Sequence, residues 1–84
     1  MWKPSAEQDL ASAWLAATDR QAMTMAANYI DRLLADDPES LGDVRFDTVR
    51  TLVEFPLGVE FEVVEQDRIV WVLAAWDASK VSPP

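Results

Sequence analysis

The fold of this chain is decided by residues 50–76, which read RTLVEFPLGVEFEVVEQDRIVWVLAAW. Runs of β-branched and aromatic side chains predict three strands, at residues 50–55, 59–64 and 69–75. Pro56 ends the first run, because proline has no N–H to donate to a strand ladder. The polar residues 65–68 separate the last two runs and predict a hairpin turn.

The register of this hairpin follows if the two central turn residues form its loop. Val64 then faces Ile69, and the pairing continues as far as Glu60 opposite Leu73. Because side chains alternate across a strand, one face is apolar on both strands and is the predicted core side. That face carries Val59, Phe61, Val63, Val70 and Val72. The other face sets carboxylates beside a row of large apolar side chains, namely Glu60 and Glu62 beside Ile69, Trp71 and Leu73.

Residues 5–36 predict two helices, because apolar residues recur at helical spacing before and after Thr18-Asp19. The first apolar stripe is Ala6, Leu10, Ala13, Trp14 and Ala17. The second is Ala22, Met25 or Ala26, Tyr29, Ile30 and Leu33, with Met23 and Leu34 at its margin. The short connection between the helices predicts an antiparallel helical hairpin.

Helices therefore precede strands, and this segregation indicates an α+β fold. We expect an N-terminal helical hairpin packed on one face of a small antiparallel sheet of three to four strands. Residues 39–47 are predicted to be a polar connector, and residues 79–84 a loose, proline-ended tail. The whole chain, residues 1–84, is predicted to form one domain.

The composition excludes several kinds of site. The chain has no cysteine and no histidine, so it lacks Cys-based metal sites and the commonest general base. We therefore expect no metal and no cofactor. No segment approaches the ~20 apolar residues of a membrane helix, and no signal peptide is visible, so we expect a cytoplasmic protein.

The net charge is −8, from 15 acidic and 7 basic residues. Binding to a phosphate backbone draws on clustered Lys and Arg, whereas the basic residues here are scattered along the chain. Direct binding of nucleic acid is therefore not expected. A basic partner is one interpretation of the acidic surface, and a merely solvated surface is the other.

Short motifs follow one another in a characteristic order along residues 3–76. They are Pro4, Ala6, Glu7, Asp9-Leu10 and Trp14-Leu15, then Ile30 to Leu34 with Asp37-Pro38, then Arg50-Thr51-Leu52, Pro56-Leu57-Gly58-Val59 and Phe61-Glu62-Val63, and finally Asp67-Arg68-Ile69-Val70-Trp71-Val72. In this order and spacing they resemble the RelE/ParE family of toxins from bacterial type II toxin–antitoxin systems.

The resemblance implies a toxin that binds a cognate antitoxin, which in this family lays a helix or strand on the toxin. It also implies one of two activities: poisoning of gyrase through protein binding, or cleavage of messenger RNA on the ribosome. A degenerate, non-toxic dimerisation module of the same fold is a third interpretation, and homodimer formation is left open. We favour action through protein–protein binding, and we do not expect an enzyme.

The resemblance also exposes two departures. Family members usually begin with a strand, but only Met1 to Lys3 precede Pro4, so that strand is a stub or absent and leaves a sheet edge open. Ribonuclease members use Lys and Arg on the sheet with a Tyr or His near the C-terminal end. The lone tyrosine, Tyr29, is instead predicted to lie in the core.

RNA cleavage needs a general base, an acid and a cation for the developing phosphorane charge. The basic residues of the strand half, Arg50, Arg68 and Lys80, are weak catalytic candidates. Glu60 and Glu62 would repel phosphate, and as a carboxylate pair they are better interpreted as a solvent-facing strand surface than as acid–base or metal-binding groups.

The apolar row of the last strand is the better candidate for a site. An exposed apolar surface of this size is typical of an interaction surface, and the resemblance supplies an antitoxin to occupy it. The predicted partner-binding residues are Ile69, Trp71, Leu73 and Trp76. The alternative is that the tail, a second copy or a different strand register covers them.

Overall fold

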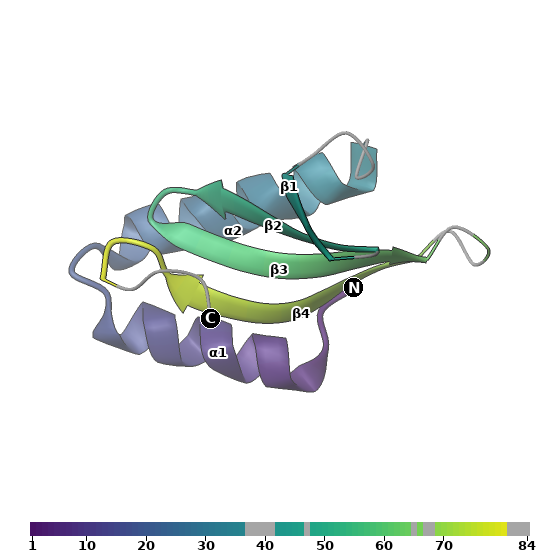
Figure 1. Ribbon diagram of the computed structural model, residues 1–84. Coiled ribbons are helices and arrows are strands. Elements are labelled where there is room, and N and C mark those ends of the chain that lie inside the picture. The colour runs from purple at the N-terminus through teal and green to yellow at the C-terminus, as the bar shows by residue number, and fades with distance from the viewer. Residues whose placement is uncertain (37–41, 47, 65, 67–68, 81–84) are drawn as a thin grey trace.

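The computed structural model describes residues 1–36, 42–46, 48–64, 66 and 69–80 of the chain (Figure 1). Two helices come first and strands follow, as the sequence predicts. The elements are α1 (Pro4–Ala16), α2 (Arg20–Asp36), β1 (Asp43–Phe46), β2 (Val49–Glu54), β3 (Leu57–Val64) and β4 (Ile69–Asp77). The strands form one antiparallel sheet in the order β1-β2-β3-β4. Neither helix is long and apolar enough to cross a membrane.

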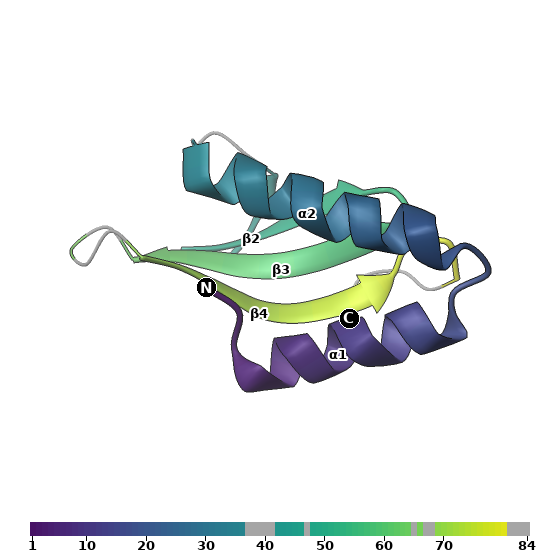
Figure 2. The same ribbon diagram turned by 180° about the vertical axis from the view of Figure 1, so that it is seen from behind.

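The helices pack on the sheet in different ways. Helix α2 crosses one face of the sheet over β2 and β3, whereas α1 runs beside β4 (Figure 2). The α+β prediction, with an N-terminal pair of helices on a small antiparallel sheet, is thus confirmed. We call the sheet face under α2 the helix face and the opposite one the reverse face.

The core lies between α2 and the helix face. Of the predicted face of the hairpin, Val59, Phe61 and Val72 are fully buried, and Val63 and Val70 are partly buried. The other fully buried side chains are Leu57, at the start of β3, and Ala6, Met23 and Ile30 of the helices. The predicted stripe of α2 is displaced around the helix. Met23 and Leu34, predicted to lie at its margin, are buried, whereas Tyr29 is 42% exposed and the prediction that it lies in the core is wrong.

The hairpin register is correct over its first four pairs and wrong after them. Val64 pairs with Ile69, and the pairing continues to Phe61 opposite Val72. A bulge then intervenes, so that Glu60 pairs with Ala74 instead of Leu73. One extra residue in a strand reverses the facing of every later side chain. An alternating sequence pattern contains no sign of that extra residue.

The outer edge of β4 is paired, near its start, with the residues that precede α1. Trp2 forms a parallel bridge with Val72, so these residues run as a short extended stub beside β4. The amide of Lys3 donates to the Val72 carbonyl at 2.9 Å, and the Val72 amide donates to the Met1 carbonyl at 2.8 Å. Further along, the Ala75 amide donates to Asp9 Oδ2 of α1 at 3.2 Å. The prediction of an open edge here is therefore wrong.

Two predictions for the connecting segments also need correction. Part of the predicted connector 39–47 is the strand β1, whose four residues gain their order by pairing with β2. The predicted tail begins in ordered structure: Ser79 binds Asp77 Oδ1, and Lys80 Nζ donates to the Ala16 carbonyl at the end of α1 at 2.6 Å. The remainder of the tail, residues 81–84, lies outside the described residues.

Candidate functional site

Ile69 and Trp71 of the predicted partner-binding row lie on the reverse face of the sheet, which Figure 1 shows turned toward the viewer, whereas Leu73 is the extra residue of the bulge and has no strand partner. Residues directly opposite each other on paired strands share a face. Trp71 pairs with Glu62 on β3, which in turn pairs with Val49 on β2, so these side chains lie on the face opposite Phe61 and the core. Ile69, Trp71 and Leu73 are each half-buried, so part of each side chain remains accessible.

Trp71 is the centre of this row and is held from one side by the N-terminal stub. Lys3 places its ammonium 4.3 Å from the centre of the Trp71 ring, within the range of a cation–π contact. The neighbouring residue Trp2 points the other way, and its indole N–H donates to Asp31 Oδ1 of α2 at 2.7 Å. The stub thus contacts both Trp71 on the reverse face and Asp31 on α2.

Carboxylates flank the row on the strands beside it. Glu62 accepts a hydrogen bond from Thr48 Oγ1 at 2.7 Å, so its carboxylate is oriented along the sheet surface. Glu60 pairs with Thr51, and Thr51 pairs with Asp43 on β1, which brings a third carboxylate to the same face. An apolar strip with a carboxylate rim favours a ligand that combines apolar and basic groups.

Trp76 belongs to the same face but does not present a binding surface. Its strand partner is Gly58, and its ring lies directly over that glycine. A Cβ on Gly58 would come within 2.3 Å of the indole Cε2 atom. Trp76 is 7% exposed, and within the described part of the chain its indole N–H has no hydrogen-bond partner. This tryptophan therefore packs against the sheet, and we leave it out of the docking surface.

The weak catalytic candidates do not converge. Arg50 pairs with Phe61, which places it on the helix face, away from the apolar row. Lys80 lies at the C-terminal end of β4, where it caps α1. The end of β4 lies level with Glu54 of β2, through Leu57 of β3. Glu54 is four residues after Arg50, so the two residues are ~13 Å apart along the strand at 3.3 Å per residue. Arg68 lies outside the described residues.

A perturbed carboxyl sits at that same end of the sheet. Asp77 is 9% exposed and accepts from both the hydroxyl and the amide of Ser79, at 2.5 and 2.9 Å. The hydrogen bond from the Ser79 hydroxyl is the main cause that lowers the pKa of Asp77, with Lys80 acting in the same direction and burial opposing them. The Asp77 carboxylate is hydrogen-bonded within its own turn, so its role is to hold the turn in place.

Sequence reasoning missed Lys3 and a second surface on α2. The cation–π contact of Lys3 depends on the stub strand, whose pairing no local pattern reveals. The second surface surrounds Met25 and Tyr29 and is described below. Its signal was present, because Met25 and Tyr29 are large side chains at helical spacing that were assigned to the core.

Comparison with known proteins rests on structure, since neither a protein-family model nor a curated protein sequence matches the chain. The fold is similar to that in the toxin–antitoxin complex RelBE2 from Mycobacterium tuberculosis, with a TM-score of 0.73 and 11% identity over 92% of this chain and 93% of that one. It is also similar to the chromosomal ParDE toxin–antitoxin system from P. aeruginosa, with a TM-score of 0.58 and 17% identity over 90% of each chain. The fold that the sequence predicts is thereby confirmed.

Proposed function

We propose that this chain, which has the RelE/ParE toxin fold, is the toxin of a type II toxin–antitoxin pair and acts by binding proteins. The observation that carries the proposal is the apolar row on the reverse face, centred on Trp71 and rimmed by carboxylates. In this proposal the row receives a segment of the antitoxin.

The charge on the reverse face supports a protein ligand over RNA. Among the described groups there, Asp43, Glu60 and Glu62 supply negative charge, against the ammonium of Lys3 and the N-terminal ammonium at the edge of β4. A phosphate backbone approaching this face would meet carboxylates within a few ångströms, a repulsion that the net charge of −8 reinforces. An apolar protein segment with basic flanks would meet the opposite sign.

The similar structures support an antitoxin as the partner. RelBE2 and ParDE are both toxin–antitoxin systems, and RelBE2 was solved as a toxin–antitoxin complex. For the cellular target, we propose gyrase-type inhibition through protein contact, in the cytoplasm. Ribosome-dependent RNA cleavage has less support, because Arg50 and Lys80 lie apart from each other and from the row.

The partner surface is tested with two matched substitutions. The binding partner in this assay is the protein encoded by the reading frame next to this gene, which is purified together with the chain. The affinity of the two proteins for each other is measured by calorimetry. We expect Trp71→Glu to weaken binding by ~30-fold, since a central aromatic contact is worth ~2 kcal/mol. Leu15→Glu is the control, because Leu15 is 64% exposed on α1. Equal affinities for both variants, with native circular dichroism, would refute the surface.

The activity is tested separately by expressing the chain without the neighbouring protein. We expect growth arrest with intact messenger RNA, and inhibition of DNA supercoiling by purified gyrase. Degradation of messenger RNA during the arrest would contradict gyrase inhibition and would indicate a ribonuclease activity instead. Normal growth would indicate a non-toxic module of the same fold.

A further inference from the structure

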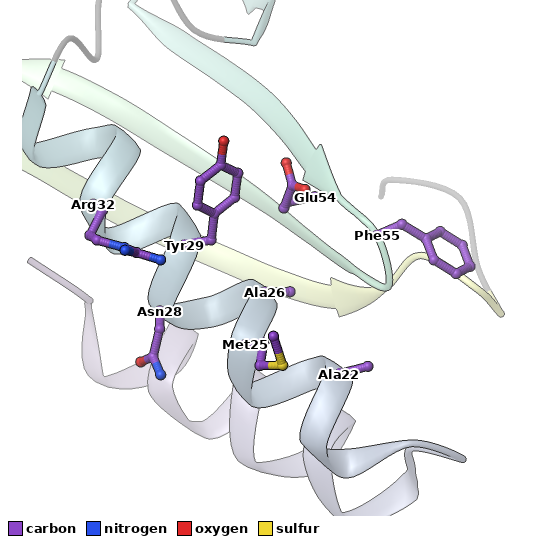
Figure 3. Close-up of a pocket in the computed structure, with 8 residues that line it drawn as sticks. All are labelled: Ala22, Met25, Ala26, Asn28, Tyr29, Arg32, Glu54 and Phe55. Carbon is purple, nitrogen blue, oxygen red and sulfur yellow. The ribbon is translucent and has the colours of Figure 1, made fainter.

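The structure contains a groove on the side of the molecule opposite the apolar row. It has a volume of about 470 Å³ and lies between α2 and the turn that joins β2 to β3 (Figure 3). Its lining residues are Ala22, Met25, Ala26, Asn28, Tyr29 and Arg32 of α2, with Glu54 and Phe55 on the other wall. The small residues Ala22 and Ala26 form its floor, so the helix leaves room for a side chain from outside.

Large apolar side chains surround this floor and remain in solvent. Met25 is 63% exposed, Tyr29 is 42% exposed, and Phe55 at the β2–β3 turn is 71% exposed. The core does not require them, because α2 buries a different stripe that includes Met23 and Ile30. Methionine and aromatic side chains gathered around a hollow are typical of an interface core.

The charges of the groove are also arranged in a complementary way. Arg32 lies over the Tyr29 ring, with its guanidinium carbon 5.7 Å from the ring centre. Glu54 stands on the opposite wall, near the end of β2, as Figure 3 shows. Within the described residues no ion pair joins Arg32 to Glu54. Each wall therefore offers one charge to a ligand, positive on α2 and negative on β2.

We propose that this groove is the contact surface between two copies of the chain. A twofold interface brings the same patch of both copies together, so that residue i meets residue j and residue j meets residue i. This patch holds both halves of such a contact. Phe55 is an exposed knob beside an alanine-floored hollow, and Arg32 of each copy would meet Glu54 of the other. The dimer leaves the reverse face accessible, so it is compatible with antitoxin binding there.

The experiment measures the average mass of the full chain by sedimentation equilibrium at protein concentrations from about 10 µM to about 1 mM. Dissociation constants in this range are expected for a small, transient interface. We expect a monomer–dimer equilibrium. Met25→Asp should raise its dissociation constant at least about tenfold. Leu15→Asp is the matched control, because Leu15 is 64% exposed on α1, and it should change the constant less than about twofold.

A charge exchange tests the twofold geometry. Arg32→Glu and Glu54→Arg should each weaken the dimer, because each places like charges across the interface. The double variant restores opposite charges in the exchanged order and should recover the wild-type constant within about threefold. Nonspecific adhesion of apolar surfaces would show no such recovery.

Three results would overturn the proposal: a monomer at every concentration, equal effects of Met25→Asp and Leu15→Asp, or a double variant that dimerises no more tightly than the single ones. A monomer whose Met25→Asp variant loses affinity for the neighbouring protein would assign the groove to that partner instead. These readouts are independent of Trp71→Glu, so the dimer and the proposed function fail separately.

Discussion

Replacing Gly58 by alanine tests the contact that decides how the start of β3 packs against the end of β4. A Cβ at this position would lie 2.3 Å from Cε2, 2.4 Å from Nε1 and 2.6 Å from Cζ2 of the Trp76 indole. Ordinary carbon–carbon contact is at about 3.5 Å, so the ring would have to retreat by more than about 1 Å. Trp76 is 7% exposed, so that movement would have to displace the groups packed around the ring.

The expected cost follows from two opposing effects. Overpacking of this kind costs about 1–3 kcal/mol, whereas removing a glycine from a strand interior gains about 0.5–1 kcal/mol. The difference is about 0–2.5 kcal/mol, and because three indole atoms would come too close, we expect Gly58→Ala to lower the free energy of unfolding by about 1–2 kcal/mol. For a chain of 84 residues the total is about 4–13 kcal/mol, so the loss is readily measured.

The assay is urea denaturation followed by far-ultraviolet circular dichroism at pH 7. The control is the same glycine substitution in a Trp76→Leu background, where the clash is gone and Gly58→Ala should be neutral or slightly stabilising. The two substitutions should therefore show a coupling free energy of at least about 1 kcal/mol. An equal cost in both backgrounds, or no cost in the wild type, would refute the packing of Trp76 on Gly58.

Three further substitutions address other parts of the fold. Ile30→Ala should lower the free energy of unfolding by about 2–5 kcal/mol in the same assay, whereas Met25→Ala on the exposed side of α2 should change it by less than about 0.5 kcal/mol. A larger loss for Met25→Ala than for Ile30→Ala would mean that α2 buries the side that carries Met25. Gly42→Ala should cost about 1–2 kcal/mol, because Gly42 has φ of +70°, and thermal unfolding at an unchanged midpoint would contradict this. The pKa of Asp77 is lowered by the Ser79 hydroxyl, so this contribution to stability is present above the ordinary carboxyl pKa of about 3.9 and is lost as pH falls through the folded value. Ser79→Ala should therefore raise the pKa of Asp77 in a carbon-13 NMR titration and destabilise the protein at pH 7 but not at pH 2; a constant difference across that range would exclude the linkage.

The sequence alone determined the elements and most of the sheet. Alternating β-branched and aromatic residues mark β2, β3 and β4, and the polar run between Val64 and Ile69 sets the first four pairs of the hairpin. These features are local, since they depend on residues a few positions apart. The order of two helices followed by strands was enough to predict an α+β fold, and the order and spacing of short motifs predicted the RelE/ParE arrangement.

The tertiary structure alone decided which surfaces remain exposed. The bulge opposite Glu60 turns Trp76 onto Gly58, and the stub at Trp2 closes the edge of β4. The packing of α2 on the sheet buries Met23 and exposes Tyr29, although both lie close to the predicted stripe. Each outcome joins residues far apart in the chain, and its free energy comes from burial and pairing that exist once the sheet has formed. A periodic pattern indicates that an element has an apolar side, whereas the partner that covers this side is set by the assembled fold.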